Sequence, residues 1–251
     1  MRNLYASIGY DGHNFRGFQS QPHGNTIQDH CRKVCVEFFG NDCGLVGISR
    51  TDAGVHAFDQ RIQFRVDSKI PTNKIAQVMN SRLNGVRMHW AREMPNEFEI
   101  RNVSHKKTYD YELRIGQRQP VHEHFSWQLE LFPASLDILD RILAEFVGEH
   151  DFILFSRKDP RRKLLSTVRI VDSVEVNQLE PGYLRISVRA NGFLWYMMRY
   201  ILSYSVATWQ GLLSMSDLRE MLSGKSRDRR NRVSVKPAPA SGLYLKSCEI
   251  I

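Results

Sequence analysis

The chain has 251 residues, of which 42% are hydrophobic and 25% charged, a composition typical of a folded globular protein. It has no apolar run near the roughly 18 residues that a membrane-spanning helix requires, and no signal peptide is apparent, so we expect a cytoplasmic protein. The net charge is +8, with 13 basic against 10 acidic residues up to Ser104 and 22 against 17 after it. Because the excess is spread over the chain, we expect a folded surface that binds a polyanion, nucleic acid above all.

The first half of the chain is predicted to fold as β-α-β-β-α-β. Period-two alternation indicates strands, and apolar residues at helical spacing between a Thr cap and a closing Gly indicate the first helix. The predicted elements are the strand Leu4–Tyr10, a helix between Thr26 and Gly40, the strands Leu45–Ser49 and Arg61–Val66, the helix Ile70–Leu83 and the strand Val86–Glu93.

The second half also alternates strands with helices. Its predicted elements are the strand Thr108–Ile115, a helix that starts after Ser135 and ends at Gly148, the strands Val168–Val176 and Leu184–Ala190, the helices Phe193–Trp209 and Ser216–Leu222, and the strand Leu243–Cys248. This pattern predicts an α+β protein of two domains, residues 1–104 and 105–251.

The stretch from Gly47 to Ala57 contains Arg50, Asp52 and Gly54 directly after a predicted strand. Such a loop presents a carboxylate at a strand end, and small residues beside it allow a substrate to come close. Arg50 can hold the carboxylate ionised or bind a phosphate. Chemistry alone does not distinguish this arrangement from an ordinary surface loop with an Arg–Asp pair.

The eight residues Arg50-Thr51-Asp52-Ala53-Gly54-Val55-His56-Ala57 resemble the signature of the TruA family of pseudouridine synthases. Further matches follow in the order of the family. They are Tyr10-Asp11-Gly12 with Phe15, Gly17, Phe18, Gln19 and Gln21, then Ile27-Gln28, Lys107-Thr108-Tyr109-Asp110-Tyr111, Gly148-Glu149-His150-Asp151-Phe152, Asn191 to Arg199, and Gly242-Leu243-Tyr244-Leu245. The resemblance covers nearly the whole chain.

This resemblance implies a tRNA pseudouridine synthase in which Asp52 is the essential catalytic aspartate. It implies that Arg50 helps to displace the target base from its stack, and that Tyr109 stacks on that base. Arg199 matches the family arginine that pairs with the aspartate. Without the family, Arg199 on an apolar helix and Tyr109 in a strand are more often structural residues.

The resemblance also implies the architecture, the partners and the target. We expect two RNA-recognition-like α/β sandwiches that share an extended antiparallel sheet and form a central active-site cleft. We expect a homodimer that binds tRNA and modifies uridines 38 to 40 of the anticodon stem-loop, with no cofactor and no metal. The His122-x-His124 pair lacks the further ligands that a metal site needs.

Two basic clusters are candidates for contact with tRNA phosphates, the alternative being an ordinary solvated surface. One contains Arg157, Lys158 and the candidate RNA contacts Arg161, Arg162 and Lys163, and the other contains Arg227, Arg229, Arg230 and Arg232.

Other functions stay open at this stage. A non-catalytic RNA-binding protein of the same fold would also be basic, although the aromatic RNA-recognition signature is absent. A synthase that acts on another RNA, or an aspartate-dependent hydrolase that releases free base, would share the Asp52 loop.

Overall fold

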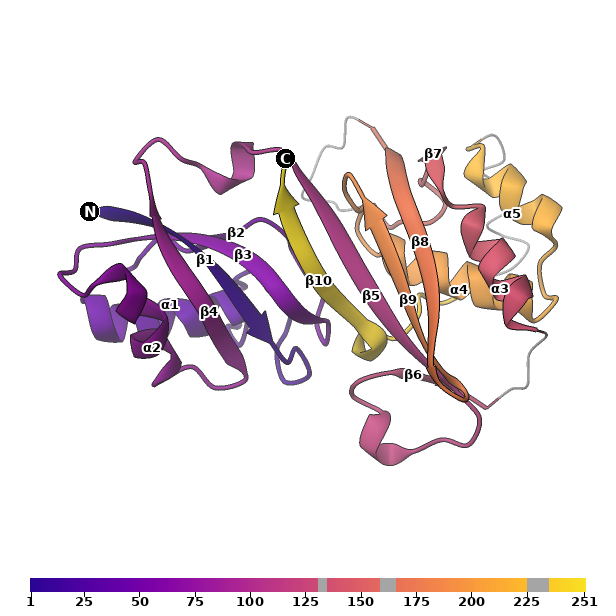
Figure 1. Ribbon diagram of the computed structural model, residues 1–251, viewed down its shortest axis with the longest axis horizontal. Helices are drawn as coiled ribbons and strands as arrows, with labels where there is room; N and C mark the ends of the chain where they lie inside the picture. The colour runs from indigo at the N-terminus through magenta and orange to yellow at the C-terminus, as the bar shows by residue number, and fades with distance from the viewer. Residues whose placement is uncertain (131–134, 159–165, 225–234) are drawn as a thin grey trace. The chain divides into compact units, whose positions relative to one another are not determined.

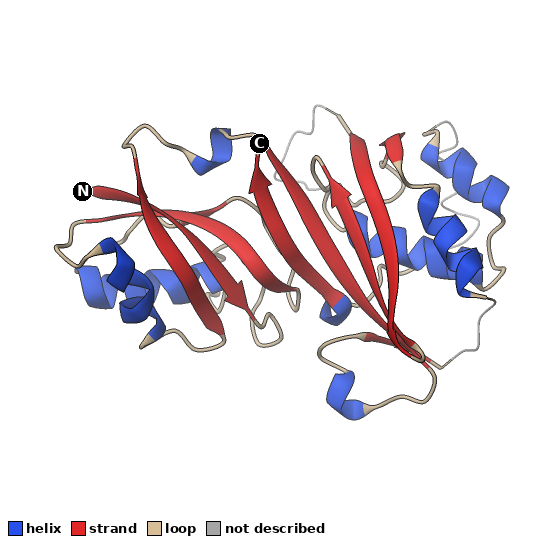
Figure 2. Cartoon of the chain, in the orientation of Figure 1, coloured by secondary structure: helices blue, strands red, loops and turns tan. Residues whose placement is uncertain are grey.

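The computed structural model describes residues 1–130, 135–158, 166–224 and 235–251. Within them the chain forms two compact units, Met1–His105 with Tyr244–Ile251, and Lys106–Leu243. Each unit combines a sheet with helices (Figure 2), so the expected α+β class is confirmed.

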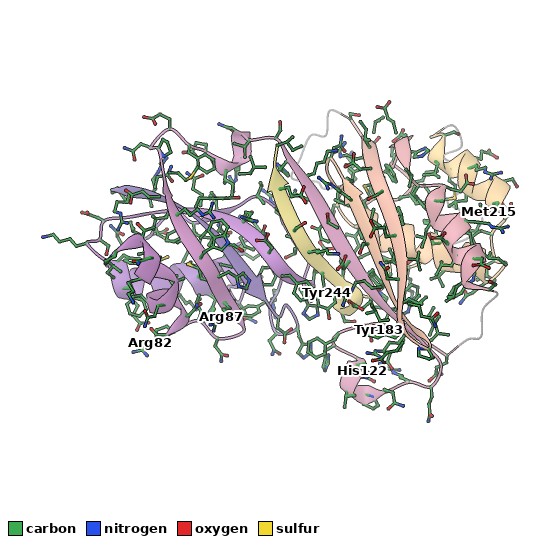
Figure 3. All side chains as sticks on the ribbon, viewed as in Figure 1. Arg82, Arg87, His122, Tyr183, Met215 and Tyr244 are labelled. Carbon is green, nitrogen blue, oxygen red and sulfur yellow. The ribbon has the colours of Figure 1, made fainter. Side chains whose placement is uncertain are left out.

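The first unit follows the predicted order β-α-β-β-α-β. Its elements are β1 (Arg2–Tyr10), α1 (Ile27–Phe39), β2 (Val46–Gly47), β3 (His56–Val66), α2 (Thr72–Asn80), β4 (Val86–Met94) and, from the end of the chain, β10 (Leu243–Ile250). The strands lie in the order β4-β1-β3-β10, and β2 pairs with β3 (Figure 1). Figure 3 labels Arg82 and Arg87 at the turn from α2 into β4.

The first helix forms where the capping residues predict it. The Thr26 side chain accepts a hydrogen bond from the Asp29 amide at 3.2 Å and donates one to the Asp29 carboxylate at 2.6 Å. At the other end Gly40 has φ 76° and its amide donates to the Val36 carbonyl, as expected of a left-handed helix cap. This helix buries Ile27, Cys31 and Cys35, which anchor it in the core.

The strands around the Asp52 loop differ in length from the prediction. β2 has only two residues, whereas β3 begins at His56, five residues before the predicted start. β3 starts earlier than predicted because it pairs with β1 in antiparallel fashion from Arg2↔Val66 to Tyr10↔Ala57. The last two residues of the signature therefore belong to a strand.

The second unit contains the remaining strands and helices. They are β5 (His105–Ile115), β6 (Trp127–Leu129), α3 (Leu136–Ala144), β7 (Gly148–Asp151), β8 (Val168–Glu180), β9 (Tyr183–Ala190), α4 (Met197–Trp209) and α5 (Met215–Leu222). The strands lie in the order β5-β9-β8-β7, and α3 and α5 both pack on α4 (Figure 1). The predicted hairpin around Gly182 is confirmed, with φ 74° at that glycine.

Two predicted helix boundaries in this unit are wrong. α3 ends at Ala144 instead of Gly148, because Gly148 adopts φ 109° and opens β7 opposite Val171. α4 begins at Met197 instead of Phe193, because Tyr196 adopts a left-handed conformation, with φ 66°, that a right-handed helix cannot contain.

The last strand returns to the first unit. β10 pairs in parallel with β3, with Tyr244 opposite His56 and Leu245 opposite Ala57. The sequence-based division assigned residues 105–251 to the second domain, whereas in the structure Tyr244–Ile251 group with the first unit. The pairs β10–β3 and β6–β5 are parallel, which departs from the expected antiparallel sheet.

Two other kinds of feature are absent from the described part of the chain. None of its helices combines the length and apolar character needed to cross a membrane. The described residues also contain no group of three or more His, Cys, Asp or Glu side chains arranged to hold a metal ion.

Candidate functional site

The loop that carries Asp52 connects β2 to β3 in the first unit. The amide of Val55 donates a hydrogen bond to the Asp52 carbonyl at 3.2 Å, and Gly54 has φ 79°, so residues 52–55 form a tight turn. Thr51 and Val55 are buried, Ala53 is exposed and Asp52 is half-buried. The turn therefore fixes the Asp52 backbone and leaves its carboxylate partly accessible.

Hydrogen bonds from outside the loop hold its buried residues. The hydroxyls of Tyr10 and Thr51 lie 2.8 Å apart, and the Phe18 amide donates to the Thr51 carbonyl at 3.1 Å. The Gln60 amide group donates to the Ser49 carbonyl at 2.7 Å. These bonds are buried, so the backbone of the loop that carries Asp52 is fixed before any substrate binds.

Two glycines allow the segment after β1 to approach the loop. A Cβ atom at Gly12 would lie 2.0 Å from the Val55 carbonyl oxygen, which no real side chain tolerates. Gly17 has φ 88°, and a Cβ there would lie 2.8 Å from the Thr51 carbonyl oxygen. The resemblance included both glycines without a role for either, and the structure supplies one: close contact with the backbone of the Asp52 loop.

His56, to which the sequence assigned no role, is the first residue of β3 and directly follows the same loop. It is 2% exposed, its Nδ1 accepts a hydrogen bond from the Gly12 amide at 3.2 Å, and the Asp11 carboxylate lies 3.1 Å from the same nitrogen. Its ring stacks on Tyr244, labelled in Figure 3, with centroids 4.6 Å apart. His56 thus connects the start of β3 to β10 and to the turn after β1.

Tyr109 lies in the second unit, on β5. It is 6% exposed, pairs with Val188 on β9, and meets Phe193 edge to face with ring centroids 4.8 Å apart. Phe193 belongs to the segment that leads into α4, so Tyr109 is fixed both by the sheet and by the approach to that helix.

Arg199 is half-buried in the first turn of α4. Its Nε donates to the Ala238 carbonyl at 2.6 Å, and the Ala238 amide donates to the Arg199 carbonyl at 3.1 Å. The neighbouring carbonyl of Pro239 accepts the Tyr111 hydroxyl at 2.9 Å. Burial raises the pKa of Tyr111 well above its ordinary value, so this hydroxyl stays protonated and donates.

Tyr196 has an unusual conformation at the N-terminus of α4. Apart from glycines, only Asn25 and Tyr196 have positive φ among the described residues. The Arg199 guanidinium carbon lies over the Tyr196 ring, 4.5 Å from its centroid, and that of Arg157 lies over it at 5.0 Å. This position lies within the Asn191–Arg199 match to the family, which implied no role for it.

The structure distributes the four predicted site residues over the two units. Arg50 is exposed and lies two residues from Asp52 in the first unit, whereas Tyr109 and Arg199 belong to the second. The candidate RNA contacts Arg161, Arg162 and Lys163, and the cluster Arg227, Arg229, Arg230 and Arg232, lie outside the described residues.

Comparisons with known proteins agree with the signature. A family model described as tRNA pseudouridine synthase matches residues 142–249. The chain is 33% identical over 249 residues to tRNA pseudouridine synthase A of Ruminiclostridium cellulolyticum, and the aligned region covers 98% of both chains. It is 34% identical over 252 residues to tRNA pseudouridine synthase A 2 of Bacillus thuringiensis, with 99% of this chain and 100% of the relative covered.

A solved structure described as a Cbf5-Nop10-Gar1 complex matches more distantly. The match covers 81% of this chain and 54% of that chain, with 11% sequence identity and a TM-score of 0.36. A likeness of this size gives no information about the site.

Proposed function

Since the chain belongs to the TruA-type family of tRNA pseudouridine synthases and isomerises uridine to pseudouridine in tRNA, we propose that its targets are uridines 38 to 40 of the anticodon stem-loop. Family membership supports this choice of target. We propose further that the protein acts as a homodimer, and that each of its two units is an RNA-recognition-like sandwich.

In the reaction, the bond between the ribose and N1 of uracil is broken, the base rotates, and a new bond forms between the ribose and carbon 5. The proton on carbon 5 is lost and N1 gains one, so the atoms balance without a cofactor. A carboxylate can serve as nucleophile or base, provided that it is ionised. We propose that Asp52 is this carboxylate.

Three further residues complete the proposed site. Arg199 supplies the positive charge that keeps Asp52 ionised and stabilises charge in the transition state. Tyr109 stacks on the target base, and Arg50 helps to hold that base out of the helical stack, which it must leave before its atoms can react. All four are assigned from their match to the family motifs.

One observation carries the assignment of Asp52. Its turn is held by the buried Tyr10–Thr51 hydrogen bond and by the close approach of Gly17, so the backbone that carries the half-buried Asp52 side chain is preorganised. Surface loops are usually more mobile than the elements they connect, whereas functional side chains are held on a rigid support.

The test is tritium release from unmodified tRNA that carries tritium at carbon 5 of uridine. We expect wild type to release tritium, and Asp52→Ala to release none while its affinity for tRNA stays within about threefold. Asp67→Ala is the matched control, because Asp67 is an exposed aspartate of the same unit beyond the end of β3. Its turnover should equal that of wild type.

Other results would contradict the proposal. Turnover by Asp52→Ala would remove that residue from the chemistry, and appearance of free uracil would indicate a hydrolase. Mapping of pseudouridine outside positions 38 to 40 would leave the reaction in place and overturn the proposed target.

A further inference from the structure

Tyr196 occupies the position before α4 in a conformation that its side chain disfavours. Its backbone has φ 66° and ψ 2°, and its side chain makes no capping hydrogen bond to the helix. Among residues with a side chain, Asn and Asp tolerate this region far better than an aromatic residue. The other such position, Asn25, conforms to this rule. Contacts of the Tyr196 ring must therefore offset the strain.

Those contacts are with two arginines. The guanidinium carbons of Arg199 and Arg157 lie 4.5 Å and 5.0 Å from the ring centroid, both within the range of a cation–π interaction. The negative face of an aromatic ring attracts each guanidinium, and this attraction offsets the repulsion between two like charges near one another.

Arg157 is itself held in place. Its amide donates to the Trp195 carbonyl at 2.9 Å, and its Nε donates to the Tyr200 hydroxyl at 3.2 Å. Tyr200 is 4% exposed and lies one helical turn after Tyr196. The turn that follows β7 is thereby attached to the start of α4 beside the Tyr196 ring.

Two contacts within the second unit therefore support the Arg199 side chain. The Ala238 carbonyl fixes its Nε at 2.6 Å, and the Tyr196 ring lies beside its guanidinium. The hydrogen bond at Nε does not by itself set the tilt of the guanidinium, and the Tyr196 ring beside the guanidinium carbon restricts that tilt.

We propose that Tyr196 is a positioning residue for the reaction, which orients the Arg199 guanidinium with its aromatic face. The inference rests on the proposed role of Arg199 in catalysis. It assigns the function to the ring and not to the hydroxyl, and it explains why an aromatic residue occupies a strained backbone position next to a site arginine.

Substitutions at position 196 separate the ring from the backbone. Tyr196→Phe keeps the ring, whereas Tyr196→Asn and Tyr196→Gly remove it and relieve the left-handed strain, so both should fold. In the tritium-release assay on unmodified tRNA, we expect Phe to retain kcat within about twofold. We expect Asn and Gly to lower kcat about tenfold, with KM within about twofold of wild type.

Combination with Arg199→Ala tests whether Tyr196 acts through Arg199. We expect Arg199→Ala alone to lower kcat at least a hundredfold, and Tyr196→Asn to cause no further loss in that background. A further tenfold loss there would mean that the two residues act independently, which overturns the inference.

The remaining outcomes distinguish the inference from the function on which it rests. Wild-type kcat in Tyr196→Asn, with a large loss in Arg199→Ala, overturns the role of Tyr196 alone. Loss in Tyr196→Phe equal to that in Tyr196→Asn also overturns it, because the ring is then not what matters. Wild-type kcat in Arg199→Ala overturns the proposed role of Arg199 and this inference together.

Discussion

The hydroxyl of Tyr10, at the end of β1, lies 2.8 Å from the hydroxyl of Thr51, the residue before Asp52. Both residues are buried, and they are 41 positions apart in the chain. This hydrogen bond links the first strand of the protein to the backbone of Asp52, for which we propose the catalytic role, so its loss should affect catalysis before it affects the fold.

We predict that Tyr10→Phe lowers kcat for tritium release about fivefold and the free energy of unfolding by about 1 kcal/mol, because one buried hydrogen bond is lost while the ring stays. Steady-state kinetics and urea unfolding measure the two effects. Tyr5→Phe, on the same strand, is the control, since its hydroxyl accepts a long hydrogen bond from Arg61, at 3.5 Å. Equal loss of kcat in both variants would refute the role of the Tyr10–Thr51 bond.

We predict that Gly17→Ala destabilises the protein more than Gly24→Ala. Both glycines have positive φ, so both substitutions introduce backbone strain of about 1 kcal/mol. A Cβ at Gly17 would also lie 2.8 Å from the Thr51 carbonyl oxygen, whereas one at Gly24 would meet nothing within 4 Å. We expect an additional loss of about 2 kcal/mol and at least tenfold lower kcat for Gly17→Ala alone. Urea unfolding that gives equal values for the two variants would exclude the steric contact.

The ion pair between α3 and α5 should make stability depend on pH. Arg219 donates two hydrogen bonds to the Glu145 carboxylate, at 2.6 and 2.8 Å, and chiefly this donation lowers the pKa of Glu145 below 4.5. Since the folded pKa lies below the unfolded one, the stabilisation is present above pH 4.5 and is lost as pH falls through the folded pKa.

We therefore predict that Arg219→Gln lowers Tm by about 1–2 °C at pH 7, a small effect because Arg219 is largely exposed, and by less at pH 3, where Glu145 is protonated to a greater extent. Glu145→Gln should behave in the same way, and the double variant should lose no more than either single one. Thermal unfolding at the two pH values provides the measurement. A difference from wild type that is as large at pH 3 as at pH 7 would show that the effect does not come from the ion pair.

The proposed target makes a prediction about the substrate. A tRNA transcript in which uridines 38 to 40 are replaced by cytidines should release no tritium from its remaining uridines, while its affinity for the enzyme stays within about threefold. Affinity should be retained because phosphate contacts, which do not depend on base identity, supply most of the binding. Release at an unchanged rate would place the modified uridine elsewhere in the tRNA.

Several features of the fold could be predicted from local patterns. The Thr26 and Asp29 cap, the closing Gly40 and the hairpin at Gly182 are all where the sequence predicted them, because capping and turns depend on neighbours in the chain. The start of α4 could not be predicted in this way. The apolar run from Phe193 favours a helix. Tyr196, whose ring contacts Arg199, adopts a left-handed conformation, so the helix begins only at Met197.

By itself the sequence determined the family and the reaction, because the signature from Arg50 to Ala57 and the ordered matches after it are local strings of residues. Only the tertiary structure decided what holds the site residues in place. The Thr51 hydroxyl forms a hydrogen bond with Tyr10, the Arg199 side chain donates one to Ala238, 39 positions away, and β10 pairs with β3. These contacts join residues far apart in the chain, and no local pattern of polarity or propensity specifies which distant partner a side chain will meet once the core has packed.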